Sequence, residues 1–145
     1  MKKGDEPIIV EEIFETSISA VWSSITDIDQ MRQWYFGNIP AFKPEVGFET
    51  RFNVQSQDRT FVHMWRITEV VPLKKIKHNW RYDNYPGDSF VTFELFQEDT
   101  STKLVLTCDI VESFPDNIPE FTRESCYAGW KYFINERLKD YLEKK

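Results

Sequence analysis

The sequence contains few residues of the kinds that hold metals or form disulfides. Its 145 residues include two cysteines and two histidines. Cys108 and Cys126 lack the short spacing of zinc ligands, and each lies in an apolar pattern. Buried thiols in such surroundings are unreactive. We therefore expect two free cysteines in the interior, with no role as metal ligands or nucleophiles.

Long apolar runs and excess positive charge are also absent. Residues 1–7 have no apolar stretch of signal-peptide length, and no later run approaches the ~18 residues of a membrane span. The net charge is −6, whereas a nucleic-acid partner requires a basic surface that neutralises phosphates. The sequence thus predicts a cytoplasmic protein with no membrane span and no nucleic-acid partner.

Motifs of catalysis and cofactor binding are missing as well. The five glycines form no phosphate-binding loop, and no Gly-x-Ser-x-Gly nucleophile elbow occurs. Glu11 and Glu12 fall on opposite faces of a predicted strand, so they cannot act as a carboxylate pair. Glu69 falls near the end of another strand, where a surface salt bridge is its ordinary role. We therefore expect no catalytic residues and no cofactor.

Aromatic residues, in contrast, are abundant. The chain has twelve Phe, six Tyr and five Trp, which together make 16% of its residues. Rings in this number either fill a core or line a concave apolar site. The length is that of one domain, long enough to bury a core of either kind.

The first part of the chain reads as a strand followed by two short helices. Residues 8–14 are rich in β-branched side chains, which favours a strand. Thr16 or Ser17 can cap the helix that follows, because apolar residues then recur at helical spacing. Asp27 and Gln30 have the spacing of a capping box, which predicts a second short helix directly after the first.

The rest of the chain alternates and then becomes helical. Alternation predicts strands over residues 48–54, 60–71, 75–82, 90–97 and 103–111. Asn117 and Glu120 have capping-box spacing at the start of a long final helix. Its apolar stripe contains Cys126, Trp130, Phe133, Ile134, Leu138, Tyr141 and Leu142. These elements predict an α+β fold over residues 1–145, in which a curved antiparallel sheet wraps around the long C-terminal helix as a single domain.

A hairpin turn is predicted at Pro72, and it fixes which side chains face one another. Pairing across this turn places odd-numbered residues of one strand opposite even-numbered residues of the next. The shared inner face then contains Phe61, His63, Trp65, Ile67, Ile76, His78, Trp80 and Tyr82. Trp65 lies close to Trp80 or Tyr82 in this register, unless a β-bulge shifts it.

The two histidines do not share a partner in this register. Pairing leaves His63 and His78 roughly four to six residues out of step, which separates them by roughly 13–20 Å. We therefore expect no shared metal ion. Each histidine is either a core residue bonded to the main chain or a polar group that orients a ligand.

Several short segments resemble a known superfamily in the order in which they occur. They are Val21-Trp22, Thr26-Asp27, Met31-Arg32-Gln33-Trp34, Glu45-Val46-Gly47-Phe48, Thr68-Glu69-Val70-Val71-Pro72, Trp80-Arg81-Tyr82, Val91-Thr92-Phe93-Glu94-Leu95 and Ala128-Gly129-Trp130. The pattern is similar to the SRPBCC (START-like, birch pollen allergen-like) superfamily. Within it, the chain looks most like the group named after the activator of the heat shock protein 90 ATPase. The resemblance extends from about residue 7 to residue 141.

The resemblance implies a START-like domain with a helix-grip fold and a cavity between sheet and helix. It leaves the function open, because the superfamily includes lipid carriers, hormone receptors, cyclases and co-chaperone domains. The eukaryotic chaperone activators carry a separate N-terminal domain for which this chain has no room, so we expect no strong chaperone activation from it.

Strand faces, helix stripe and family pattern together predict the lining of the cavity. The candidate ligand-binding residues are Trp34, Phe36, Phe48, His63, Trp65, Trp80, Tyr82, Phe93, Trp130 and Phe133. The first hypothesis is non-enzymatic binding of a small hydrophobic or amphipathic ligand among them. The alternatives are a protein–protein module that acts as a co-chaperone-like partner of heat shock protein 90, and a cyclase- or hydrolase-like enzyme. The oligomeric state is open.

Overall fold

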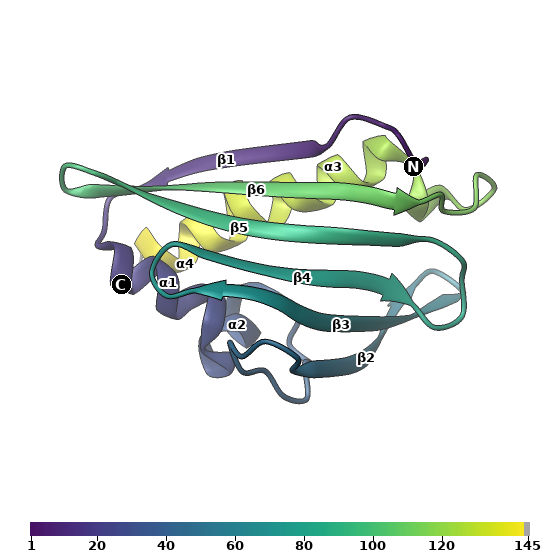
Figure 1. Ribbon diagram of the computed structural model, residues 1–145, viewed down its shortest axis with the longest axis horizontal. Coiled ribbons are helices and arrows are strands. Elements are labelled where there is room, and N and C mark those ends of the chain that lie inside the picture. Colours follow the sequence, from purple (N-terminus) through teal and green to yellow (C-terminus); the bar gives the residue numbers. More distant parts are fainter. Residues whose placement is uncertain (144–145) are drawn as a thin grey trace.

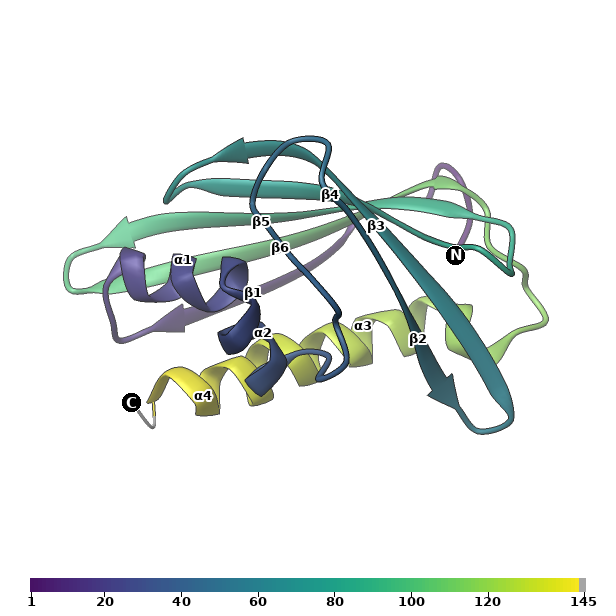
Figure 2. The same ribbon diagram turned by 90° about the horizontal axis from the view of Figure 1, so that it is seen from below.

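A computed structural model describes residues 1–143 and shows two layers, a curved antiparallel sheet and a layer of helices on one of its faces (Figures 1 and 2). The strand order is β1-β6-β5-β4-β3-β2. The strands are β1 (Ile8–Phe14), β2 (Glu49–Ser56), β3 (Arg59–Val71), β4 (Lys75–Tyr82), β5 (Asp88–Glu98) and β6 (Ser101–Glu112). The predicted helix-grip α+β fold is confirmed.

The two short helices follow β1 as predicted, with one difference in their caps. In α1 (Ile18–Thr26), the Ser17 side chain accepts a hydrogen bond from the main chain of Ala20 at 3.2 Å. Asp27 precedes α2 (Ile28–Trp34), but its side chain makes no capping hydrogen bond. The predicted capping box is therefore wrong, and Gln30 instead accepts a hydrogen bond from the Tyr141 hydroxyl.

The register between β3 and β4 brings the two strand tryptophans face to face. Trp65 pairs with Trp80, as one of the two predicted neighbours, and their ring centroids are 5.2 Å apart. The register shifts between Ile67 and Glu69, which marks a β-bulge at Thr68. The bulge lies beyond the tryptophans, so the predicted inner face is retained from His63 to Ile67 on β3 and from His78 to Tyr82 on β4.

The C-terminal helix begins later than predicted and changes its winding. A short 3-10 turn, η1 (Pro119–Phe121), precedes α3 (Arg123–Lys131), and Thr122 caps α3 by accepting from Ser125. The predicted cap by Asn117 and Glu120 is therefore wrong. The helix continues as a π-helical segment, η2 (Tyr132–Leu138), and ends as α4 (Lys139–Glu143). Such segments occur frequently at functional sites.

The C-terminal helix also protects the edge strand β1. An exposed edge presents unpaired main-chain groups that invite association with other chains. Three helix side chains donate to carbonyl oxygens along this edge: Arg123 to Glu6 and Pro7, Asn135 to Glu11, and Lys139 to Ile13. The helix is thus held to the sheet by polar contacts at its margin as well as by its buried apolar stripe.

The connection between α2 and β2 is long and has no regular secondary structure. It covers residues 35–48 and crosses the space between the helices and β2 in Figure 2. Its residues Ile39 and Phe42 are buried in the core. Connections longer than about 12–15 residues without regular structure are uncommon in compact domains and are usually functional. Within residues 1–143, no helix is long and apolar enough to cross a membrane.

Candidate functional site

Most of the predicted ligand-binding residues meet in one group of rings between the sheet and the C-terminal helix. The predicted residues joined by ring contacts are Trp34, Phe36, His63, Trp65, Trp80, Tyr82, Phe93, Trp130 and Phe133. Phe48 lies apart, against Phe42 at 6.4 Å between ring centroids. The ring cluster, as we call it, consists of these joined residues together with Tyr35, Phe52 and His78.

Tyr35 is the centre of the ring cluster, although the sequence analysis did not select it. Its ring stacks on Trp34 at 4.7 Å and on Trp65 at 5.5 Å, and meets Phe133 edge-on at 4.9 Å. Tyr35 is the first residue after α2, where φ is −106° and ψ is −124°. Because the chain leaves the helix here, three consecutive aromatic residues enter the same cluster. The run of three aromatic residues, Trp34-Tyr35-Phe36, was the sequence signal from which Tyr35 could have been included in the predicted lining.

Phe52 and His78 are the other members that the predicted lining lacks. Phe52 stacks on His63 at 5.1 Å and meets Trp65 edge-on at 4.9 Å. His78 lies 4.9 Å from Trp65. Alternation placed His78 on the inner face, so its face was predicted correctly and only the choice of lining residues was incomplete; Phe52 was not assigned to that face. Tyr82, at the other end, connects the cluster to a second group of rings around Phe121.

The rings interlock and leave almost no empty space. The gap beside Tyr35 and His78 has a volume of about 10 Å³, which is about the room for one water molecule. Trp65 is 2% exposed and Tyr35 is 6% exposed. The sequence left open whether the rings line a cavity or fill a core, and in this conformation they fill it.

The ring cluster nevertheless contains polar atoms without partners. Within residues 1–143, the buried polar atoms that make no hydrogen bond are the Tyr35 hydroxyl, the Thr50 hydroxyl, Trp65 Nε1 and Trp80 Nε1. Thr50 pairs with Trp65 in the register of β2 and β3. Trp80 lies near the Tyr82 hydroxyl, where burial raises the pKa of Tyr82 above its usual value and the nearby indole partly offsets this rise. The residues that carry these atoms all adjoin Trp65: Thr50 pairs with it across the strands, and the rings of Tyr35 and Trp80 contact its ring.

The two histidines add acceptors to this region. The Nδ1 of His63 donates to the Phe61 carbonyl at 3.1 Å, and the Nδ1 of His78 donates to the Asn79 carbonyl at 3.0 Å. A carbonyl can only accept, so Nε2 of each ring is the deprotonated nitrogen. Burial lowers the pKa of both histidines from 6.5 to about 4. Both are therefore neutral at physiological pH.

Burial keeps the Tyr35 hydroxyl and the Cys108 thiol protonated. Burial raises the pKa of the Tyr35 hydroxyl well above its usual value, so Tyr35 remains a hydrogen-bond donor. A hydrogen bond with the adjacent Cys126 thiol, together with burial, raises the pKa of Cys108, which makes Cys108 a poor nucleophile. The same hydrogen bond lowers the pKa of Cys126, which is half-buried and not fully in the interior as expected. Among residues 1–143, no group of three or more His, Cys, Asp or Glu side chains could hold a metal ion. The geometry is suited to holding a molecule by contact and hydrogen bonding.

Comparison with solved structures identifies the same fold in bacterial proteins. Protein CV1439 from Chromobacterium violaceum is 21% identical, with a TM-score of 0.79 over 95% of this chain and 97% of that one. Protein MLL2253 from Mesorhizobium loti is 25% identical, with a TM-score of 0.75 over 97% and 98%. Aha1 from Colwellia psychrerythraea, solved as a dimer, is 20% identical, with a TM-score of 0.70 over 96% and 97%. No curated protein matches the chain by sequence.

A family model settles the relationship that the sequence motifs indicated. The model describes the Activator of Hsp90 ATPase homolog 1-like proteins and matches residues 15–143. The match begins just after β1 and includes every later helix and strand of the fold. This chain therefore belongs to the Activator of Hsp90 ATPase homolog 1-like family, within the SRPBCC superfamily.

Proposed function

We propose that this protein binds a small amphipathic ligand, without chemical conversion, in the ring cluster between the sheet and the C-terminal helix. The observation that carries the proposal is the set of partnerless polar atoms on Tyr35, Thr50, Trp65 and Trp80. A buried donor without a partner costs about 1–3 kcal/mol, and native cores contain few of them. Their concentration in one aromatic region supports a site that a ligand completes.

The chemistry of these atoms defines the ligand. Tyr35 and the two indole groups are donors, so the ligand must present at least one acceptor, such as a carbonyl or hydroxyl oxygen. The surrounding rings require that the rest of the ligand be apolar and preferably flat, since stacked and edge-on ring contacts then continue through it. His63 and His78 can accept a hydrogen bond at Nε2 from a ligand hydroxyl. A ligand of this kind has a polar end that forms hydrogen bonds and an apolar body.

A ligand can enter only if part of the ring cluster moves, because the existing gap holds about 10 Å³. Phe36 is the member best placed to move, since it is half-buried and lies in the irregular connection of residues 35–48. Its outward movement would open space between Phe52, Trp65 and Phe133, which it contacts directly. We infer that Phe36 plugs the empty site and that the ligand takes its place among the rings, beside the Tyr35 hydroxyl.

The test is binding of a fluorescent naphthalene that carries one ketone, propionyl-dimethylaminonaphthalene, to three proteins. The wild type should bind it with a blue shift in emission. Tyr35→Phe keeps the ring but removes the donor, so its affinity should be about tenfold lower. Tyr85→Phe is the matched control, because Tyr85 packs against Phe61 and Phe121 and touches no partnerless donor.

Two results would contradict the proposal. One is equal affinity of the wild type and Tyr35→Phe for the ketone. The other is no binding by any of the three proteins, together with a free energy of unfolding that the ketone does not change. The ring cluster would then be an ordinary filled core, and the function would lie on the surface.

Membership of the family favours a second candidate, a module that contacts a chaperone through its surface. The test is an ATPase assay of the heat shock protein 90 chaperone from the same cell. We expect no large stimulation by this chain alone. Stimulation of several-fold at micromolar protein, retained by a variant that no longer binds the ketone, would place the partner hypothesis first.

A further inference from the structure

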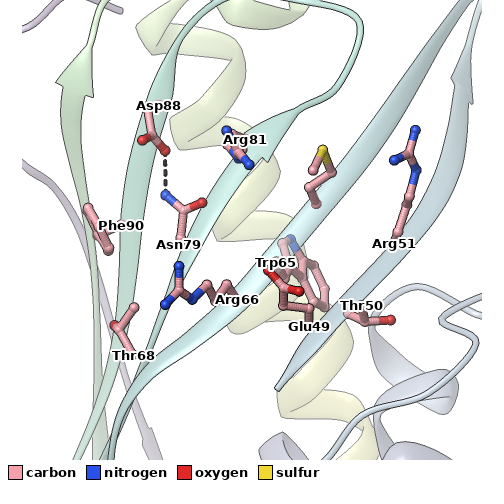
Figure 3. A pocket seen from close by; sticks show the side chains of 11 residues that line it. Glu49, Thr50, Arg51, Trp65, Arg66, Thr68, Asn79, Arg81, Asp88 and Phe90 are labelled. Atoms are coloured by element: carbon pink, nitrogen blue, oxygen red, sulfur yellow. Dashed lines mark hydrogen bonds between the residues drawn. The ribbon is translucent and has the colours of Figure 1, made fainter. Parts of the chain in front are cut away.

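The outer face of the sheet, opposite the ring cluster, contains an open groove. It has a volume of about 520 Å³ and is open to solvent. Figure 3 shows the side chains that line it. Strands β2, β3, β4 and β5 all contribute to it. A groove of this size is within the range of ligand sites. Nothing in the function proposed above uses it.

Three arginines from three neighbouring strands line this groove. Arg51 projects from β2, Arg66 from β3 and Arg81 from β4, and all three are exposed. Arg51 is ion-paired with Asp83. Among the described residues, the guanidinium groups of Arg66 and Arg81 have neither a hydrogen bond nor an ion pair. Two guanidinium groups whose hydrogen-bond donors are all unused among the described residues thus face the groove, in a protein whose net charge is −6.

The rest of the lining gives the groove an apolar floor and acidic ends. Met64 and Phe90 are half-buried: Met64 pairs with both Arg51 and Arg81, and Phe90 pairs with Asn79 at the β5 side of the groove. Glu49 lies at the β2 side, and Asp88 lies at the β5 side, where it accepts a hydrogen bond from Asn79 (Figure 3). The positive region is therefore short and is bounded on two sides by carboxylates.

The spacing of the arginines indicates what fits between them. Arg66 pairs with Asn79, two residues from Arg81, so the two arginines are diagonal neighbours about 7–8 Å apart. Arg51 and Arg81 both pair with Met64, which separates them by two strand spacings, or about 10 Å. Alternate side chains of an extended peptide are about 7 Å apart. We propose that the groove binds a short acidic segment of a partner protein in extended form, with carboxylates on Arg66 and Arg81.

The same features disfavour other anions. A single phosphate needs donors that converge on one point, whereas these guanidinium groups belong to positions about 7–10 Å apart. A nucleic acid needs a long basic path, and Glu49 and Asp88 interrupt the path after three arginines. The apolar floor suits side chains of the peptide that lie between its carboxylates.

Fluorescence anisotropy with a labelled hexapeptide of alternating glutamate and leucine tests this site. The matched probe replaces each glutamate by glutamine. Arg66→Gln/Arg81→Gln should weaken binding of the acidic peptide about five- to tenfold, since exposed charge pairs are individually weak. Lys43→Gln/Lys74→Gln removes the same charge at two exposed positions outside the groove, and should change the affinity less than about twofold.

Each alternative outcome is decisive. Equal weakening by the two double variants would mean that only net charge matters, which would overturn the site. Equal binding of the glutamine peptide would overturn the requirement for carboxylates. If inorganic phosphate at matched ionic strength displaced the acidic peptide completely, the groove would be a small-anion site and not a peptide site. If a single-stranded oligonucleotide bound more tightly than the acidic peptide, the groove would be a nucleic-acid site. Ligand binding in the ring cluster is independent of all these outcomes.

Discussion

The two faces of the sheet differ completely although they are made by the same strands. On β3, Trp65 enters the ring cluster and is 2% exposed, while the next residue, Arg66, projects into the outer groove. Within residues 1–143, the inner face is closed and leaves four buried polar atoms without partners. The outer face is open, and in the same part of the chain the guanidinium groups of Arg66 and Arg81 make no hydrogen bond or ion pair. Strand alternation thus gives one small sheet two separate surfaces, one suited to a small amphipathic molecule and one to an acidic chain.

The largest expected effect contrasts Trp65 with Arg66. Trp65→Ala should lower the free energy of unfolding by about 3–5 kcal/mol, because it removes a buried ring that contacts its neighbours on all sides. Arg66→Ala should change it by less than about 0.5 kcal/mol. Urea unfolding followed by circular dichroism measures both. A loss below about 2 kcal/mol for Trp65→Ala would mean that the ring cluster is already open in solution.

Acid should destabilise the inner face through its histidines. The pKa of His63 and of His78 is lowered to about 4 in the folded protein, so between pH 4 and 6.5 the unfolded chain binds more protons. Stability therefore falls as the pH falls through this window. Between pH 7.5 and 5.0 each histidine should contribute a loss of about 2 kcal/mol.

Urea unfolding at several pH values, with His78→Phe as the comparison, checks the acid effect. Phenylalanine retains a ring but cannot be protonated, so the variant should lose about half of the dependence on pH between 5.0 and 7.5. An unchanged dependence in His78→Phe would show that other groups, such as surface carboxylates, cause the acid sensitivity.

Tyr35→Phe should have a smaller effect on stability, and one of opposite sign. Without ligand, loss of a buried hydroxyl that has no partner should raise the free energy of unfolding by about 1 kcal/mol. A purely structural Tyr35 would make the variant less stable or leave it unchanged. Higher stability combined with weaker binding of the ketone is the signature that a functional, partnerless donor produces.

The outer arginines should have the smallest effect on stability. Arg66→Gln/Arg81→Gln leaves packing intact and breaks no ion pair, so the free energy of unfolding should change by less than about 0.5 kcal/mol. Thermal unfolding of the double variant measures this change. A large loss would show that the arginines hold the sheet together, and their exposure would then have no functional meaning.

Alternation and helical spacing were sufficient to predict most of the fold. The predicted bounds of β1 and β4 coincide with the observed ones, and Trp65 faces Trp80 because an odd position opposes an even one. The predicted start of the C-terminal helix was wrong, because Glu120 forms an ion pair with Arg59 at 2.9 Å instead of capping the helix. A long-range ion pair had overridden a local capping pattern.

The candidate site was less accessible to prediction. Tyr35 lies where a helix ends, and no periodicity says where a side chain points after such a break. Phe48 was assigned by strand alternation, but β2 begins one residue later and Phe48 turns toward Phe42. Whether rings leave a space between them depends on rotamers and on the curvature of the sheet, neither of which has a sequence signal. The shape of the outer groove also depends on rotamers and on the curvature of the sheet, so it could not be predicted from the sequence either.

The indole N–H signals of the tryptophans test the central claim most directly. In the free protein, Trp34 Nε1 donates to the Ser24 carbonyl at 2.7 Å, whereas Trp65 Nε1 and Trp80 Nε1 make no hydrogen bond. Titration of the ¹⁵N-labelled protein with the naphthyl ketone should shift the Trp65 and Trp80 indole protons downfield, because they gain an acceptor, and should leave Trp34 in place. Saturating ketone that shifts neither Trp65 nor Trp80, or that moves Trp34 as far as both, would contradict a ligand site in the ring cluster.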